Sequence, residues 1–272
     1  MNRLQARFDA LAAAGRKALV PFVTAGDPSL SATVPVLHAL VEAGADLLEI
    51  GVPFSDPMAD GPVIQRSSER ALGRGAGLGW VLAQVRAFRD SDRDTPVVLM
   101  GYLNPVEIRG ADAFAREAVA AGVDGVLLVD LPPEEAGEVR ASFDGHGLAL
   151  VPLVAPTTSE ARLPGICQGA RGYIYYVSLA GVTGTRAADA AAIAPHLAQV
   201  RAACALPVLV GFGIRDGATA AAMAPHADGV VVGSALVQAM AEATDPADAA
   251  TRASAFLAPI RAALDRAPAT LR

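Results

Sequence analysis

Residues 46–62 read Asp-Leu-Leu-Glu-Ile-Gly-Val-Pro-Phe-Ser-Asp-Pro-Met-Ala-Asp-Gly-Pro, an apolar run that gives way to a loop rich in proline and glycine. The aliphatic residues around Glu49 favour a short β-strand that is covered on both faces. Three prolines and two glycines then prevent a helix or strand from continuing. Glu49 is therefore expected on a rigid strand, whereas Asp60 is expected in a loop that can move.

A glutamate inside such a strand needs an explanation. An ionised carboxylate in apolar surroundings is costly unless it is hydrogen-bonded, paired or protonated. Glu49 could simply be satisfied by a backbone group or an arginine, or it could be catalytic. Asp60 in the same segment favours catalysis, because two carboxylates in different environments can divide acid and base roles.

Length and composition bound the class of protein. The 272 residues, 53% of them hydrophobic, can form one large core and suit a single α/β barrel domain spanning residues 1–272. The formal net charge of -6 argues against a nucleic-acid-binding surface.

Membrane insertion and disulfide bonding are not expected either. The sequence contains no apolar run of about 18 residues, and residues 1–8 open an amphipathic helix rather than a signal peptide. We expect a cytoplasmic protein. Cys167 and Cys204 are too few for a disulfide framework or a metal site and are interpreted as packing residues.

Strand-like and helix-like segments alternate along the whole chain. We expect eight strands, at residues 18–24, 46–52, 96–102, 124–130, 148–154, 171–178, 207–212 and 228–233. We expect helices after the N-terminal one at residues 29–43, 62–72, 77–90, 110–121, 132–145, 158–168, 189–204, 215–224 and 234–265. Such alternation without a linker predicts a single (β/α)8 TIM barrel with an additional N-terminal helix.

In such barrels the active site lies at the carboxyl ends of the strands. The four histidines are expected in helices or in loops at the opposite end, as is the only lysine, Lys17, so an imine-forming mechanism is nearly excluded. No Gly-x-Ser-x-Gly motif is present. Acid/base chemistry by carboxylates is what remains.

Other polar residues at this end have more ordinary interpretations. Asp27 directly precedes Pro28 and Asp130 lies two positions before Pro132, and both are expected to cap a turn or a helix. Tyr173 and Tyr175 lie two positions apart in one strand and therefore share a face, so at least one of them could line the site.

Glycines cluster where the last two strands end. Gly211-Phe212-Gly213-Ile214 closes the seventh strand, and Gly233-Ser234 closes the eighth just before a helix. Barrels frequently bind phosphate there through backbone N–H groups. Tight turns alone could explain these glycines, but two such loops favour a phosphorylated ligand, over which residues 181–185 could close.

Four motifs resemble the tryptophan synthase alpha subunit family, and the resemblance covers essentially the whole chain. They lie at residues 21–28 (Pro-Phe-Val-Thr-Ala-Gly-Asp-Pro), 49–62, 181–184 (Gly-Val-Thr-Gly) and 211–214. The resemblance implies a lyase of tryptophan biosynthesis that cleaves indole-3-glycerol phosphate into indole and glyceraldehyde 3-phosphate by a retro-aldol reaction, with no metal or organic cofactor.

The resemblance also implies roles for individual residues. Glu49 would protonate indole C3 and assist loss of the glycerol hydroxyl proton, and Asp60 would engage the indole N–H. Thr183 would orient Asp60. The remaining substrate-binding residues would be Phe22, Leu127 and Tyr175 beside the indole, with Phe212 nearby, and Gly184, Gly213, Gly233 and Ser234 around the phosphate. Leu179 departs from the arginine of some relatives.

A partner is implied as well, the beta subunit that carries pyridoxal phosphate, in an alpha2-beta2 heterotetramer. Asp56, Asn104 and Pro105 would form contact surface for it. Two alternatives remain open at this stage. One is a stand-alone lyase that needs no partner, and the other is a catalytically silent barrel that only activates its partner, which intact Glu49 and Asp60 argue against.

Overall fold

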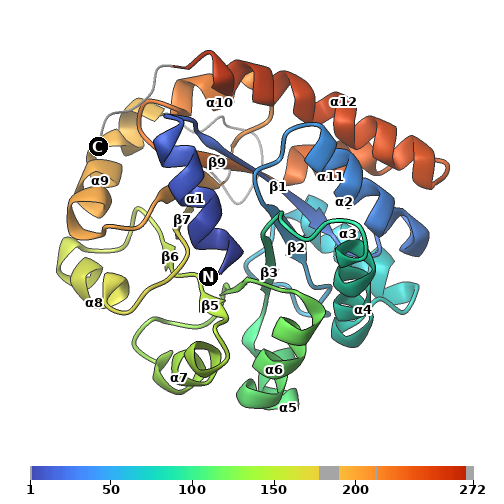
Figure 1. Cartoon of the computed structure of the whole chain (residues 1–272), viewed down its shortest axis with the longest axis horizontal. Coiled ribbons are helices and arrows are strands. Elements are labelled where there is room, and N and C mark those ends of the chain that lie inside the picture. The colour runs from blue at the N-terminus through green and yellow to red at the C-terminus, as the bar shows by residue number, and fades with distance from the viewer. Residues whose placement is uncertain (1, 178–189, 212, 268–272) are drawn as a thin grey trace.

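The computed structural model describes residues 2–177, 190–211 and 213–267, and its nine strands are all parallel. The strands form one sheet in the order β5-β4-β3-β2-β1-β9-β8-β7-β6 (Figure 1). Their bounds are β1 Ala18–Thr24, β2 Leu48–Gly51, β3 Val97–Gly101, β4 Gly125–Leu128, β5 Ala149–Leu150, β6 Leu153–Val154, β7 Ile174–Val177, β8 Val208–Gly211 and β9 Gly229–Val232.

The two ends of this sheet are consecutive in the chain, so the sheet closes on itself. β5 and β6 are the two halves of the strand expected at residues 148–154, interrupted at Val151-Pro152. Hydrogen bonds continue through the break, from Val151 N to Val126 O (2.8 Å) and from Tyr175 N to Pro152 O (2.9 Å). The predicted TIM barrel is confirmed, and the ninth strand arises from this interruption.

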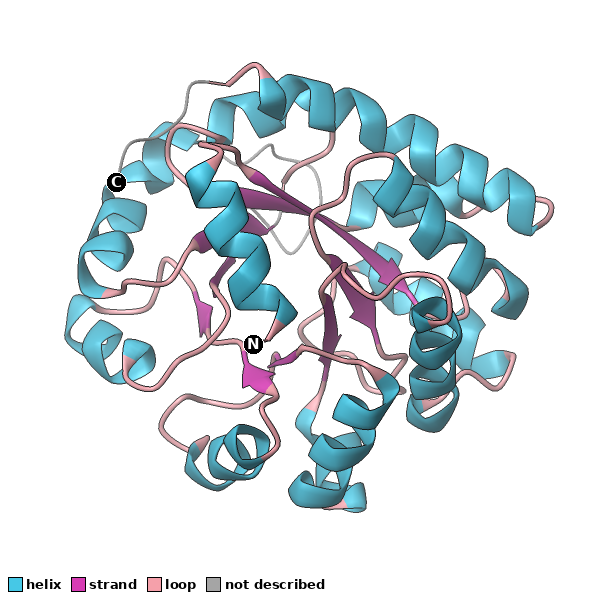
Figure 2. Ribbon diagram, in the orientation of Figure 1, coloured by secondary structure: helices cyan, strands magenta, loops and turns pink. Residues whose placement is uncertain are grey.

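Helices surround the sheet and form the outer layer (Figure 2). Their bounds are α1 Arg3–Ala13, α2 Thr33–Glu42, α3 Pro62–Gly73, α4 Leu78–Arg89, α5 Leu103–Arg109, α6 Ala111–Ala121, α7 Gly137–Gly145, α8 Leu163–Cys167, α9 Ala190–Ala203, α10 Gly217–Met223, α11 Ser234–Met240 and α12 Pro246–Asp265. No helix within the described residues combines the length and the apolar character that a membrane span requires.

The helices expected at residues 132–145 and 158–168 are shorter than predicted, as α7 and α8, and two larger differences concern α5 and the last helix. The single helix expected at residues 234–265 is divided into α11 and α12, because Asp245 starts a new helix by accepting hydrogen bonds from the backbone N–H groups of Ala247 and Asp248. Helix α5 was not expected at all. It directly follows β3 and contains Asn104 and Pro105, where no helix was expected.

Alternate strand residues face opposite layers of the barrel. Leu19, Val23 and Ile50 belong to the large apolar cluster between strands and helices. Residues of the opposite parity, including Phe22 and Leu127, belong to a second cluster that fills the barrel lumen. Glu49 shares the parity of the lumen residues, since it pairs in register with Phe22 on one side and Val98 on the other.

Helix α1 closes the amino-terminal end of the barrel, where Figure 1 shows it lying across the strands. Its buried face contributes Leu4, Phe8 and Leu11 to the lumen cluster. The rings of Phe8 and Tyr173 lie 5.8 Å apart. This closure excludes water from one end of the lumen and leaves the carboxyl ends of the strands as the accessible end.

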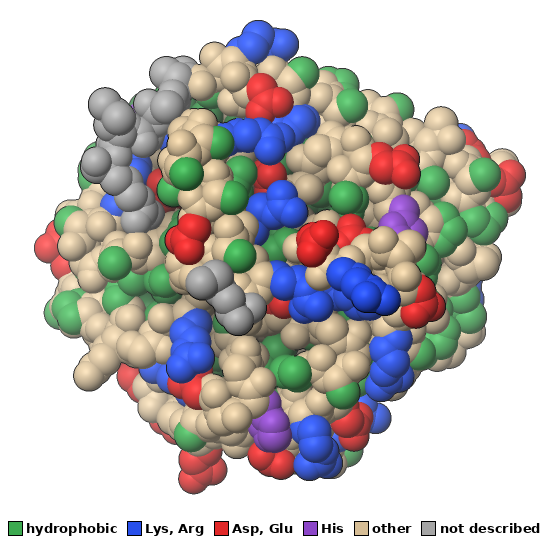
Figure 3. Space-filling view, in the orientation of Figure 1, with side chains coloured by type: hydrophobic (Ala, Val, Ile, Leu, Met, Phe, Trp, Pro, Cys, Tyr) green, Lys and Arg blue, Asp and Glu red, His purple; other side chains and the backbone are tan. Residues whose placement is uncertain are grey.

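Three aspartates repeat one arrangement at the amino-terminal end. Asp46, Asp124 and Asp228 each precede a strand, and each side chain accepts a hydrogen bond from the backbone N–H of the neighbouring strand, at Leu19, Val97 and Val208. Arginines pair with all three of these carboxylates. The described part of the face in Figure 3 accordingly mixes acidic and basic side chains and presents no uniformly basic surface.

Candidate active site

Glu49 lies in β2 on the side that faces the barrel lumen. It is completely buried, with 0% exposure. The Tyr173 hydroxyl donates a hydrogen bond to its Oε2 (3.3 Å), while its Oε1 has no hydrogen-bond partner among the described residues. Burial raises the pKa of Glu49 to about 8, the Tyr173 hydrogen bond lowers it, and the negative charge of Asp60 raises it further. Glu49 is therefore mostly protonated near neutral pH.

Asp60 lies in the loop between β2 and α3, as predicted. Its Oδ2 accepts a hydrogen bond from the Tyr102 hydroxyl (2.9 Å), and its backbone oxygen accepts one from Gln65 Nε2 (2.9 Å). Burial raises the pKa of Asp60 to about 6, against the lowering effect of Tyr102. At pH 7 Asp60 is mostly ionised, so the two carboxyl groups occupy opposite protonation states.

A cavity opens beside Asp60 at the carboxyl ends of β1, β2 and β3. It is lined by Phe22, Gly51, Val52, Asp60, Ile64, Ser68, Met100, Gly101, Tyr102 and Val129. Gly51 allows the Phe22 ring to approach, because a Cβ at position 51 would lie 2.5 Å from Phe22 Cζ. The cavity is largely apolar with one carboxylate in its wall, which suits a planar aromatic ligand that carries an N–H group.

The structure brings the predicted residues Phe22 and Asp60 into this cavity, while Leu127 and Tyr175 belong to the same lumen cluster as Phe22. Burial raises the pKa of Tyr175 well above its usual value, and the charges of Glu49 and Asp60 add to the effect. Position 211 has no room for a side chain, because a Cβ there would collide with the Tyr175 hydroxyl.

Several lining residues escaped the sequence analysis. Ile64 and Ser68 lie on α3, and Met100 shares the lumen parity of β3. Met100 could have been predicted from the sequence, because it lies two positions after Val98 in β3 and alternate strand residues face the same side. Ile64 and Ser68 could have been found only from the packing of α3 against β1, which no local pattern records.

Three of the four predicted phosphate-binding residues lie at the ends of two adjacent strands. Gly213 follows β8 with a φ of 81°, and Gly233 follows β9, where Ser234 starts α11. A Cβ on Gly233 would lie 3.7 Å from Phe22, so this end of the barrel adjoins the cavity. Thr183, Gly184, Leu179 and Phe212 lie outside the described residues.

The remaining acidic residues have structural roles. We expected Asp27 to cap a turn or a helix, but its side chain caps none of the helices that the structure describes. Its carboxylate instead accepts two hydrogen bonds from Arg70 of α3, both of 2.8 Å. Asp130 does cap a helix, but a neighbouring one, because its Oδ1 accepts a hydrogen bond from Leu103 N at the start of α5 (2.8 Å).

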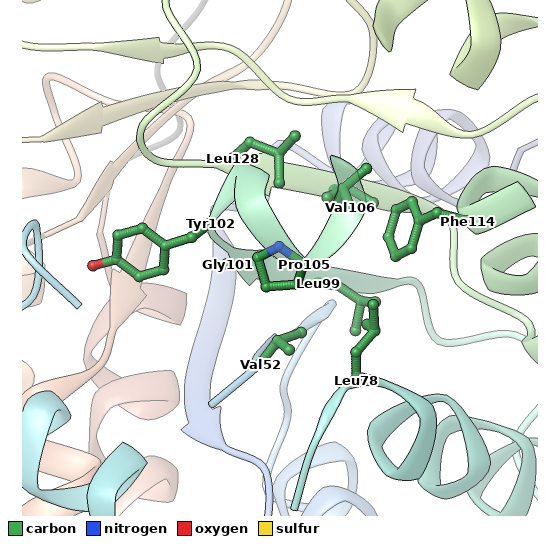
Figure 4. Close-up of a pocket in the computed structure, with 10 residues that line it drawn as sticks. Val52, Leu78, Leu99, Gly101, Tyr102, Pro105, Val106, Phe114 and Leu128 are labelled. Carbon is green, nitrogen blue, oxygen red and sulfur yellow. The ribbon is translucent and has the colours of Figure 1, made fainter. Parts of the chain in front are cut away.

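A second cavity lies between the strands and the outer helices (Figure 4). Its lining comes from β3, β4, α4, α5 and α6 and includes Leu78, Leu99, Val106, Phe114 and Leu128. It contains no carboxylate and no basic group. It is a gap in the outer apolar layer rather than a place for acid/base chemistry.

The predicted partner-contact residues lie on the surface at the same end of the barrel. Asp56 is exposed in the loop before α3, Asn104 is exposed on α5, and Pro105 is half-buried. Two large apolar side chains in the same segments are unusually exposed, Met58 at 84% and Ile108 at 82%. Exposed apolar side chains of this size mark surfaces that bind other molecules.

Comparison with known proteins agrees with this geometry. Residues 8–264 match the family model described as tryptophan synthase alpha chain. The chain is 66% identical to the tryptophan synthase alpha chain of Xanthomonas oryzae pv. oryzae, over 98% of this chain and 100% of the relative.

Solved structures give the same result. The chain resembles tryptophan synthase subunit alpha from Legionella pneumophila with a TM-score of 0.91 and 48% identity, covering 97% of this chain and 99% of the other. It also resembles a chain of tryptophan synthase from M. tuberculosis, in an aminoacrylate-bound form, with a TM-score of 0.85, 38% identity and coverage of 97% and 100%. The chain therefore belongs to the tryptophan synthase alpha chain family and is a lyase that cleaves indole-3-glycerol phosphate in tryptophan biosynthesis.

Proposed function

We propose that Glu49 and Asp60 carry out this cleavage as an acid and an anion, respectively. Glu49 donates its proton to indole C3, which converts the ring into a cation. Asp60 accepts a hydrogen bond from the indole N–H and stabilises the positive charge that develops on the ring. The opposite protonation states of the two groups near pH 7 are the observation that carries this proposal.

The second half of the reaction returns the proton to Glu49. Once C3 is protonated, the bond between C3 and the glycerol chain can break, and its electron pair restores the aromatic indole. The ionised Glu49 takes the proton of the glycerol hydroxyl, which becomes the aldehyde of glyceraldehyde 3-phosphate. Protons and electrons balance without an oxidant or reductant, and the absence of a cofactor from this chain stays a prediction.

The cavity supports a particular orientation of the substrate. Phe22 and Asp60 both line the cavity, and Leu127 and Tyr175 belong to the same lumen cluster as Phe22, so we place the indole among these side chains. The phosphate would then lie at Gly213, Gly233 and Ser234, where backbone N–H groups are available at the strand ends. Thr183, Gly184 and Phe212 complete the proposed set.

Amide variants test the two roles directly. Glu49→Gln removes the transferable proton, so we expect indole formation from indole-3-glycerol phosphate to fall by at least about a hundredfold. Asp60→Asn should lose about 3 kcal/mol of transition-state stabilisation, seen as a lower kcat. Glu138→Gln is a matched control because Glu138 is exposed on α7. Near-normal turnover by Glu49→Gln, or a change in KM alone for Asp60→Asn, would refute these roles.

We propose further that the partner is the beta subunit, in an alpha2-beta2 heterotetramer, with pyridoxal phosphate only in that subunit. The exposed Met58 and Ile108, next to Asp56, Asn104 and Pro105, support a docking surface here. Measuring lyase turnover with and without a beta subunit tests the proposal. Equal rates and no complex would favour the stand-alone lyase. A cytoplasmic location also stays a prediction.

A further inference from the structure

Tyr102 occupies the junction between β3 and α5. It follows Gly101, the last residue of β3, and it is the residue that precedes the first turn of α5. Figure 4 shows its ring pointing away from Leu99, Val106 and Phe114, so the hydroxyl leaves the outer apolar layer. The ring instead reaches the loop between β2 and α3, where its face stacks on Phe54 with the ring centroids 5.0 Å apart.

Two hydrogen bonds fix the direction of the Tyr102 hydroxyl. Its oxygen accepts a hydrogen bond from Ala59 N (3.0 Å) and lies 2.9 Å from Asp60 Oδ2. Because a backbone N–H can only donate, and a carboxylate can only accept, the hydroxyl proton must point to Asp60. Burial raises the pKa of Tyr102, and the charge of Asp60 adds to this, so the hydroxyl remains protonated and remains a donor.

The backbone of Tyr102 is held as firmly as its side chain. Leu103 N donates a hydrogen bond to Asp130 Oδ1 (2.8 Å), and Val129 N donates one to Gly101 O (3.0 Å). Both bonds tie the junction to the end of β4. Tyr102 therefore links the Asp60 loop to the rigid barrel, through one stacked ring and one hydroxyl.

We propose that Tyr102 is a positioning residue for the cleavage, which holds Asp60 Oδ2 so that Oδ1 is presented to the indole N–H. The proposal rests on the role of Asp60 proposed above. Without the hydroxyl, the Asp60 carboxylate loses the hydrogen bond that fixes its orientation and can rotate, while the stacking of the ring on Phe54 remains. A small displacement of a reacting group is costly, because catalysis depends on geometry held before the reaction starts.

The test replaces only the oxygen. Tyr102→Phe keeps the ring that stacks on Phe54, and we expect kcat for indole formation to fall about 10- to 100-fold, the range of one lost hydrogen bond to a charged group. KM should change less than kcat. Tyr176→Phe is the matched control, because it removes a hydroxyl that bonds to His196 on the outer side of the barrel.

A pH profile separates positioning from a general loss of structure. Among the described residues, the titratable groups that interact with Asp60 are Tyr102, through its hydrogen bond, and Glu49 of β2 and Tyr175 of β7, through charge. Because the Tyr102 hydrogen bond lowers the pKa of Asp60, its removal should move the acidic limb of the kcat/KM profile to higher pH, while the Tyr176→Phe profile stays in place.

Each outcome decides one statement. A reduced kcat and a shifted acidic limb in Tyr102→Phe support the proposal. Wild-type kcat and an unshifted limb in Tyr102→Phe, together with an inactive Asp60→Asn, overturn it. Near-normal turnover in Asp60→Asn overturns instead the role of Asp60. Thermal unfolding of Tyr102→Phe and Tyr176→Phe identifies a folding defect. An acidic limb of the kcat/KM profile that moves equally in both variants would also overturn the proposal.

Discussion

The ionisation of Glu49 should make the folded chain less stable as the pH rises. Burial raises the pKa of this side chain from 4.5 to about 8, so the folded state binds a proton that the unfolded state releases between these pH values. Stability is therefore fully present below about pH 4.5 and is lost as pH rises towards 8. One pKa unit corresponds to about 1.4 kcal/mol, so the full loss is on the order of 5 kcal/mol.

Glu49→Gln removes this pH dependence because an amide does not titrate. We expect the free energy of unfolding of the variant, minus that of the wild type, to grow by roughly 4 kcal/mol between pH 5 and pH 9. Urea unfolding of both proteins at pH 5, 7 and 9 measures it. Effects of the amide on packing are the same at each pH and cancel, as do the titrations of groups that do not interact with Glu49. A difference that stays constant across this range would refute the assignment of Glu49 as a buried, protonated acid.

Three further predictions follow from the same geometry. The kcat/KM profile should be bell-shaped, falling below about pH 6 as Asp60 takes up a proton and above about pH 8 as Glu49 loses one, whereas a profile that is flat from pH 5 to 9 would contradict both assignments. Tyr173→Phe removes a hydrogen bond that lowers the pKa of Glu49, so the alkaline limb should move to higher pH; no movement would show that this contact is unimportant. Arg70→Gln leaves the buried carboxylate of Asp27 without its two hydrogen bonds, which should lower the free energy of unfolding by about 2–3 kcal/mol in urea titrations, and an unchanged midpoint would contradict this.

The sequence predicts the barrel well because its signals are local and repeated. Each strand is a short apolar run bounded by glycine, proline or aspartate, and each crossover has a helical pattern. Helix α5 escaped because its cap is not local. The hydrogen bond that satisfies its first N–H comes from Asp130, 27 residues further along the chain. Likewise, the strand predicted at residues 148–154 contains Pro152, but the sequence did not show that the strand would be divided there into β5 and β6.

The candidate site also contains features that the sequence predicts and features that it does not. Glu49 and Asp60 could be identified because a carboxylate stands out within and after an apolar strand. The hydrogen bonds by which tyrosines tune them could not be predicted, because Tyr173 reaches Glu49 across 124 residues and Tyr102 reaches Asp60 across 42. The pKa values of the two acids depend on these contacts and on burial. Acid and anion roles therefore follow from the fold and not from the order of residues.

The protonation state of Glu49 in the ligand-free enzyme tests the central claim most directly. Infrared difference spectra between the wild type and Glu49→Gln isolate the carbonyl stretch of this one carboxyl group at each pH. We predict a protonated carboxyl at pH 7 that disappears as the pH passes about 8. A carboxylate that is already ionised at pH 6 would contradict the account, because Glu49 would then have no proton to give to indole C3.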